Sequence, residues 1–156
     1  MNNQTIITDS NISTEKSLYE TDFYQWALHN AELLKQGKLA DIDIENVAEE
    51  LESMGRSEKK ELRNRLAILI MHLLKWQYQP QHRSMSWKLT INTQRADIEL
   101  VLEDSPSLKH NIEITIEDAF KRAESLFEKE TNISKKYLPQ TCPYTFEQLS
   151  DYECWP

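Results

Sequence analysis

The sequence predicts an all-α fold, a single-domain bundle of about five helices with an irregular C-terminal tail. Apolar residues recur at helical spacing in every segment between turn signals. The chain holds only two Gly and five Pro, whereas an all-β fold needs Gly or Asn-Gly chemistry at nearly every tight turn. With 156 residues, the chain is long enough for one domain with a real hydrophobic core.

The N-terminal segment is expected to lie outside this core. Residues 1–17 are polar and rich in Asn, Thr and Ser, which predicts disorder. A single helical domain is expected over residues 18–156. Its helices are predicted at residues 21–36, 43–54, 57–79, 84–103 and 106–131.

Caps and stop signals set the boundaries of the first two helices. Gly37 suits the left-handed position that follows a helix, so the first helix should end just before it. Asp43 is an N-cap residue ahead of the second helix, whose apolar face holds Ile44, Val47, Ala48, Leu51 and Met54. Gly55 is expected to end this helix.

The third helix should be the central and most buried one. Leucines and Trp76 follow a 4-3-4-3 spacing from Leu62, and Pro80 ends the helix. Ser84 opens the fourth helix, and Ser105-Pro106 offers a cap and a first helical position for the fifth. Beyond Thr131 only one further helical turn is expected, at residues 145–149.

Charge is distributed unevenly along a chain whose net charge is −8. Residues 56–95 hold nine Lys or Arg and two Glu, whereas residues 41–52 hold six carboxylates and no base. We expect these segments to neutralise each other inside the fold, with Asp43, Glu49 or Glu50 pairing with Lys75, Arg83, Lys88 or Arg95. Binding of an external polyanion is the alternative, although overall acidity disfavours nucleic acid.

Several function classes lack their sequence signals. Residues 1–16 have neither the basic region nor the apolar run of a signal peptide, and no apolar stretch is long enough to span a membrane, so a cytoplasmic location is expected. Two Gly cannot build a P-loop or a dinucleotide fingerprint. The Cys142–Cys154 spacing is a poor zinc motif, and no metal or cofactor is expected.

A series of short motifs resembles a mainly cyanobacterial family catalogued as domain of unknown function number twenty-nine. The resemblance covers the chain from about Tyr19 to the C-terminus. It implies a small all-α domain and supplies no catalytic residues. The motifs are Tyr19-x-x-Asp22-x-x-x-Trp26, Asp43-x-x-Asn46-x-x-Glu49-Glu50-Leu51-x-x-Met54-Gly55, His72-Leu-Leu-Lys-Trp76, Ser86-Trp87-x-x-Thr90-Ile91, Gln94-Arg95, Pro106-Ser-Leu108 and Cys142-Pro-Tyr144.

Arg65 and His72 carry one catalytic hypothesis. Seven residues apart, they face the same side of the predicted third helix, and an Arg-x6-His spacing resembles that of helical nucleotide-binding and ribonuclease domains. In such a site the Arg would hold phosphate and the His would transfer protons. The structural alternative is a polar boundary beside the core.

A polar network of binding or structural residues is the second hypothesis. Its predicted members are Asp22, Asp43, Glu49, Glu50, His72, Lys75, Arg83, Trp87 and Arg95. Bases and aromatics also alternate between Lys75 and Arg95, a pattern that can bind nucleic acid strands or form a solvated core edge.

Two functions therefore follow from the sequence. The first is a non-enzymatic interaction or regulatory module of the cytosol that binds an unknown protein partner or forms a homo-oligomer. The second is a ribonuclease-like domain that acts on nucleic acid or nucleotides through Arg65 and His72. Solvent exposure of His72 distinguishes these two functions, because a catalytic His must be accessible to the substrate.

Overall fold

The computed structural model describes residues 17–156, so the predicted disorder of residues 1–17 falls almost entirely outside the described part. The described residues are helical and contain no strand, which confirms the all-α prediction. The chain forms two compact units that divide after Glu52. A single domain over residues 18–156 stays a prediction.

The N-terminal unit contains two helices and the start of a third. Helix α1 covers Leu18–Thr21, α2 covers Phe23–Lys35, a 3₁₀ turn η1 covers Leu39–Asp41, and α3 begins at Ile44. Gly37 has φ +68°, and the amides of Gly37 and Lys38 donate to the carbonyls of Leu34 and Leu33. This is the predicted glycine-terminated helix end, in which orphan carbonyls of the last turn are satisfied.

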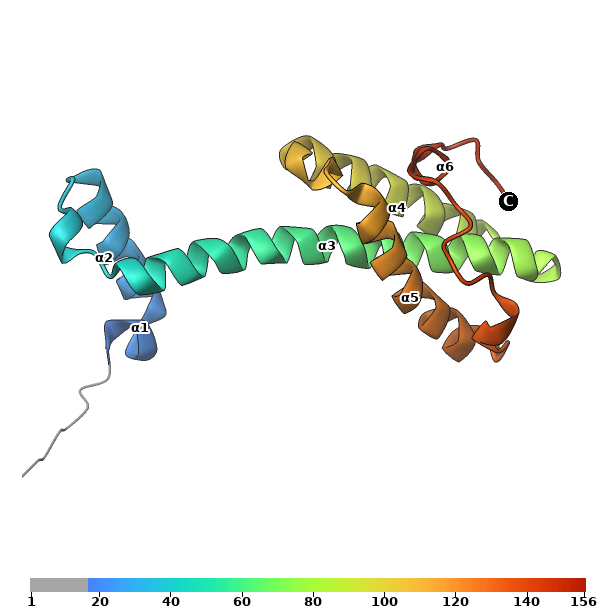
Figure 1. Cartoon of the computed structure of the whole chain (residues 1–156), viewed down its shortest axis with the longest axis horizontal. Coiled ribbons are helices and arrows are strands. Elements are labelled where there is room, and N and C mark those ends of the chain that lie inside the picture. The colour runs from blue at the N-terminus through green and yellow to red at the C-terminus, as the bar shows by residue number, and fades with distance from the viewer. Residues whose placement is uncertain (1–16) are drawn as a thin grey trace, which may run out of the picture. The chain divides into compact units, whose positions relative to one another are not determined.

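The C-terminal unit contains the rest of the helices. They are α3 (Ile44–Tyr78), η2 (Pro80–His82), α4 (Met85–Asp104), η3 (Pro106–Lys109), α5 (Ile112–Thr131), η4 (Lys135–Tyr137) and α6 (Phe146–Ser150). The chain that follows α5 runs back past α3, and α6 comes to lie beside α4 (Figure 1).

The predicted end of a helix at Gly55 is wrong. Helix α3 is continuous from Ile44 to Tyr78 and includes Gly55. One interior Gly costs a helix only about 1 kcal/mol relative to Ala, and it is surrounded here by Glu, Lys, Arg and Leu, which favour helix. The predicted second and third helices are therefore one element.

The predicted start of the fifth helix at Pro106 is also wrong. Residues 106–109 form the separate 3₁₀ turn η3, and Asn111 adopts the left-handed conformation with φ 57° before α5 begins. Asn tolerates this conformation better than most residues because its short polar side chain can bond locally. Apolar and polar residues alternate from Ile112 to Ile116 as they would in a strand, yet this segment is helical and forms the start of α5.

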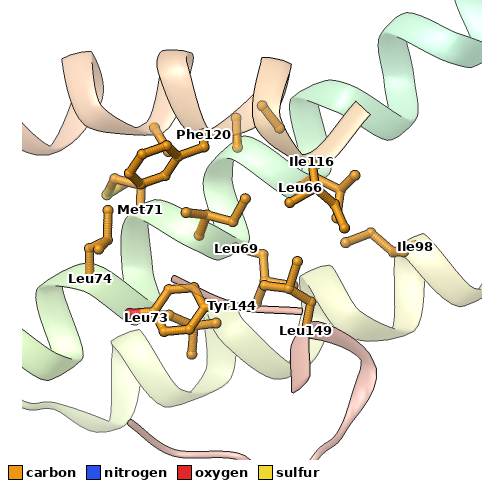
Figure 2. Close-up of a cluster of buried hydrophobic side chains, with 14 of the residues drawn as sticks. Leu66, Leu69, Met71, Leu73, Leu74, Ile98, Ile116, Phe120, Tyr144 and Leu149 are labelled. Atoms are coloured by element: carbon orange, nitrogen blue, oxygen red, sulfur yellow. The ribbon is translucent and has the colours of Figure 1, made fainter. Parts of the chain in front are cut away.

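The core lies in the C-terminal unit around α3, as predicted. Nine side chains of α3 are buried, all between Leu62 and Lys75, and they pack against α4, α5 and the C-terminal segment. Figure 2 shows Leu66, Leu69 and Leu73 of α3 among Ile98, Ile116, Phe120 and other apolar residues of these elements. The tail is irregular, yet Leu138, Tyr144 and Leu149 are buried in this core. None of the helices in the described part is long and apolar enough to span a bilayer.

Candidate functional site: a cleft beside a buried arginine

The polar motif residues of the N-terminal unit hold its helices together. Asp22 caps α2 by accepting from the amide of Gln25 at 3.0 Å. Asp43 accepts from Nε1 of Trp26 at 2.9 Å and from Nδ2 of Asn46 at 2.8 Å. These hydrogen bonds, from Asn46 first and Trp26 second, lower the pKa of Asp43. The predicted N-cap therefore also fastens α2 to the start of α3.

A second contact of the same kind joins α1 to α3. The hydroxyl of Tyr19 donates to Glu50, and this bond raises the pKa of Tyr19 because the neighbouring carboxylate disfavours a phenolate. The ring of Tyr19 lies 4.8 Å from that of Trp26, centroid to centroid. The motif residues thus have structural contacts within this unit.

Lys75 is bound inside the C-terminal unit. Its exposed fraction is 9%, its Nζ lies 2.8 Å from Oε2 of Glu130 on α5, and the same Nζ lies 4.5 Å above the ring of Trp87 on α4. Asp43, Glu50 and Lys75 have these contacts within their own units, and the predicted ion pairs between the acidic segment and the basic helices stay a prediction. Lys75 and Trp87, two members of the predicted network, are brought into direct contact here.

Arg65 and His72 have separate surroundings. Arg65 pairs with Glu61 one turn earlier on α3 and with Asp97 of α4. His72 is half-buried, and its Nδ1 lies 2.9 Å from the carbonyl oxygen of Ile68. Burial lowers the pKa of His72, and the nearby Lys75 lowers it further. The imidazole of His72 is therefore neutral and half-buried, and the guanidinium of Arg65 is bound by two carboxylates. Both are typical of polar residues at the edge of a hydrophobic core.

Aromatic rings near the end of α3 are already covered by cations of this chain. Arg83 lies 4.9 Å from the ring of Trp76 and donates from Nε to the carbonyl of the same residue. Trp155 packs against Trp76 with centroids 4.9 Å apart, and Lys88 lies 5.4 Å from the ring of Trp155. Ring faces that hold cation–π contacts are less available for stacking on nucleic acid bases.

Arg95 of α4 is the most deeply buried cation of the predicted network. Its exposed fraction is 2%. Nε donates to the carbonyl of Leu149 at 3.0 Å, and Nη2 donates to that of Cys154 at 2.8 Å and more weakly to that of Gln148. Burial lowers the pKa of Arg95 from its usual range. The guanidinium thus fastens the end of α6 and the C-terminal residues to α4.

A cleft of about 620 Å³ lies next to Arg95. Its wall is mostly apolar, and α3, α4, η3 and the C-terminal segment all contribute to it. Glu99 and Glu103 of α4 also line the cleft; they lie one helical turn apart, and both are exposed. The remaining lining residues are Leu66, Arg95, Ile98, Leu102, Pro106, Lys109, Phe146, Leu149, Ser150 and Tyr152.

The lining residues limit the chemistry that this cleft can perform. It contains no His and no Cys. Nε and Nη2 of Arg95 donate to backbone carbonyls, whereas Nη1 is buried without a hydrogen-bond partner. Among the described residues, no group of three or more His, Cys, Asp or Glu side chains is placed to hold a metal ion. The geometry suits binding through apolar contact, with Glu99 and Glu103 favouring a cation beside it.

Sequence reasoning identified Arg95 but missed the cleft beside it. The cleft depends on how α6 and Tyr152 pack against α4, which the predicted helical turn at residues 145–149 does not specify. Glu130, the partner of Lys75, and Trp155, the partner of Trp76, were also missed. Their signal in the sequence is weak, because a single Glu or Trp does not indicate which helix it contacts.

Comparison with known proteins agrees with the resemblance found in the sequence. Residues 18–155 match the family described as domain of unknown function DUF29. Comparisons with curated proteins and with solved structures gave no match. The family match covers both units, the motif residues of the N-terminal unit and the cleft beside Arg95. The chain therefore belongs to the DUF29 family.

Proposed function

We propose that this domain is a non-enzymatic interaction module of the cytosol, and that its cleft binds an apolar segment of a partner protein flanked by basic residues. The cleft beside Arg95 is the observation that carries this proposal. A hollow of about 620 Å³ lies within the size range of ligand sites, which bind through an apolar wall and few polar groups. Glu99 and Glu103 provide the preference for a basic flank.

The catalytic alternative has weaker support. Arg65 is held by two carboxylates, so a phosphate would have to displace both, and Nδ1 of His72 is occupied by a backbone carbonyl. Incubation of the purified chain with single-stranded RNA tests it. Cleavage that is lost in both Arg65→Ala and His72→Ala, with the fold intact, would establish the catalytic reading.

Selection from a displayed library of random peptides tests the proposed cleft. We expect the wild-type chain to enrich peptides with large apolar residues next to Lys or Arg. Ser150→Trp places a large ring at an exposed position of the cleft and should abolish enrichment. Ser125→Trp makes the same change at an exposed position of α5 outside the cleft and should leave it intact.

The charge preference has its own test. Glu99→Lys combined with Glu103→Lys should shift selection from basic toward acidic flanks while the apolar anchor is kept. If the wild type and Ser150→Trp enrich the same sequences, binding occurs elsewhere and the proposal is wrong.

A further inference from the structure

A basic face lies on α3 within the C-terminal unit, away from the residues that line the cleft. Lys59, Lys60 and Arg63 lie three, four and seven residues after Arg56, which places all four side chains on one side of the helix. All four are exposed, and together with Thr115 and Asp118 of α5 they line a hollow of about 300 Å³. We call these four cations the basic face.

Three of the four charges of the basic face, those of Lys59, Lys60 and Arg63, are poorly compensated within the described part of the chain. No ion pair is formed there by Lys59, Lys60 or Arg63. Asp118, the carboxylate that lines the same hollow, has its Oδ1 4.0 Å from Nζ of Lys121. Like charges at spacings of three and four residues destabilise a helix. An anionic group bound to this face would remove that repulsion.

An acidic stretch with opposite properties occupies residues 41–52 of the N-terminal unit. It carries six carboxylates and no base. Asp43 and Glu50 accept hydrogen bonds from Trp26, Asn46 and Tyr19, which are neutral donors and bring no positive charge to the stretch. Asp41 and Glu45 form no ion pair in the part of the chain described here, and both are exposed.

Exposed apolar side chains accompany both charged surfaces. Ile44 and Leu51 of the acidic stretch are 64% and 63% exposed, and Met54, which precedes the basic face, is 65% exposed. Large apolar side chains beside charged residues are typical of protein–protein contacts. A bare nucleic acid backbone would leave them in water.

We infer that two copies of this chain associate, with the acidic stretch of each bound to the basic face of the other. Charge complementarity favours this occupant, because each copy supplies both the acidic and the basic surface. Two such contacts related by a twofold axis form a closed dimer. The net charge of −8 disfavours nucleic acid at the basic face, since attraction to phosphate dominates such binding. The inference goes beyond the proposed function and does not depend on the cleft.

Charge reversal on each surface, followed by mixing, tests this dimer. One variant carries Lys59→Glu, Lys60→Glu and Arg63→Glu, and the other carries Asp41→Lys and Glu45→Lys. The full chain is followed by sedimentation velocity over a range of concentrations at low salt. We expect a dimer for the wild type and monomers for each variant alone.

An equimolar mixture of the two variants should form a dimer again, because both contacts regain opposite charges. Contacts formed within one chain could not be restored by mixing. Added salt should weaken the wild-type dimer and the mixed dimer alike. A control with Arg122→Glu and Lys129→Glu changes charge at exposed positions of α5 and should remain dimeric.

Three results would overturn the inference. One is a wild-type chain that stays monomeric at every concentration, and another is a dimer that both reversed variants retain. The third is a monomer that binds a fluorescent single-stranded oligonucleotide, with no binding by the variant in which the basic face is reversed. That result would assign this face to nucleic acid. Circular dichroism verifies the fold of each variant, and Gln at the same positions replaces any reversal that unfolds the chain.

Discussion

The indole Nε1 of Trp26 donates a hydrogen bond to Oδ2 of Asp43 at 2.9 Å. Asp43 is also the residue that precedes α3, and its Oδ1 accepts from the amide of Asn46. One carboxylate therefore caps one helix and fastens another. Among the described residues of this unit, the buried apolar side chains are Trp26 and Leu33, so polar contacts of this kind have unusual weight in holding the helices together.

Removal of the indole N–H should loosen the N-terminal unit alone. Trp26→Phe keeps an aromatic ring and deletes the donor to Asp43. We expect hydrogen exchange of α2 amides to rise by about tenfold to 100-fold, the effect of losing one hydrogen bond to a charged acceptor, which contributes about 1.5–3 kcal/mol. Exchange in α5 should not change. Equal acceleration in both helices would show that the contact stabilises the whole chain.

Substitution of the two glycines by alanine should change the free energy of unfolding in opposite directions. Gly55 is helical and a Cβ there meets nothing within 4 Å, so Gly55→Ala should raise the free energy of unfolding by about 0.5–1 kcal/mol. Gly37 has φ +68°, so Gly37→Ala should lower it by about 1–2 kcal/mol. Urea denaturation measures both. A destabilised Gly55→Ala would contradict an uninterrupted α3.

Substitutions at Lys75 and Glu130 distinguish the contribution that packing of the Lys75 side chain makes to stability from that of its ion pair. Lys75→Met keeps most of the buried stem, so we expect a loss of less than about 1.5 kcal/mol. Lys75→Ala removes the stem and both contacts and should cost about 2–3 kcal/mol. Glu130→Gln should cost about 1 kcal/mol, because Glu130 is 44% exposed at the side chain and solvent screens the pair.

Thermal and urea unfolding provide the comparison. If Lys75→Met is as damaging as Lys75→Ala, the ion pair contributes more to stability than the packing does.

His72 should make the fold sensitive to mild acid. Its pKa in the folded chain is below the ordinary value of about 6.5, so the unfolded chain binds the proton first. The contribution of neutral His72 to the free energy of unfolding is therefore complete at a pH above its ordinary pKa. It declines as the pH falls toward the pKa of His72 in the folded chain. The stability difference between the wild type and His72→Gln should shrink on acidification. Parallel stability curves for the two proteins would contradict this.

Loss of Arg95 should release the C-terminal segment. Arg95→Lys keeps the charge but cannot reach the carbonyls of Leu149 and Cys154 together, because Lys lacks the planar fork. Hydrogen bonds to a charged group contribute about 1.5–3 kcal/mol each, so cleavage by chymotrypsin near Tyr152 should accelerate by at least about tenfold. Mass spectrometry identifies the site. An unchanged cleavage pattern would show that Trp155 packing alone holds the segment.

The sequence by itself determined the helical class and the position of the central helix. Apolar spacing along the chain is a local property, and it placed Leu62 to Trp76 in the core correctly. The roles of Asp43 and Gly37 at helix ends were also identified correctly, because capping and left-handed backbone depend on the residue type itself.

Only the tertiary structure decided where Gly55, Arg95 and the C-terminal tail belong. Local propensity overestimated Gly55 as a stop, since a penalty of about 1 kcal/mol does not decide whether a long helix continues. Opposite net charges on two segments did not specify which side chains pair, because Lys75 contacts Glu130, 55 residues away in sequence. Contacts between distant residues, such as Arg95 with Cys154, depend on packing of the whole unit, and the cleft exists only once those contacts have formed.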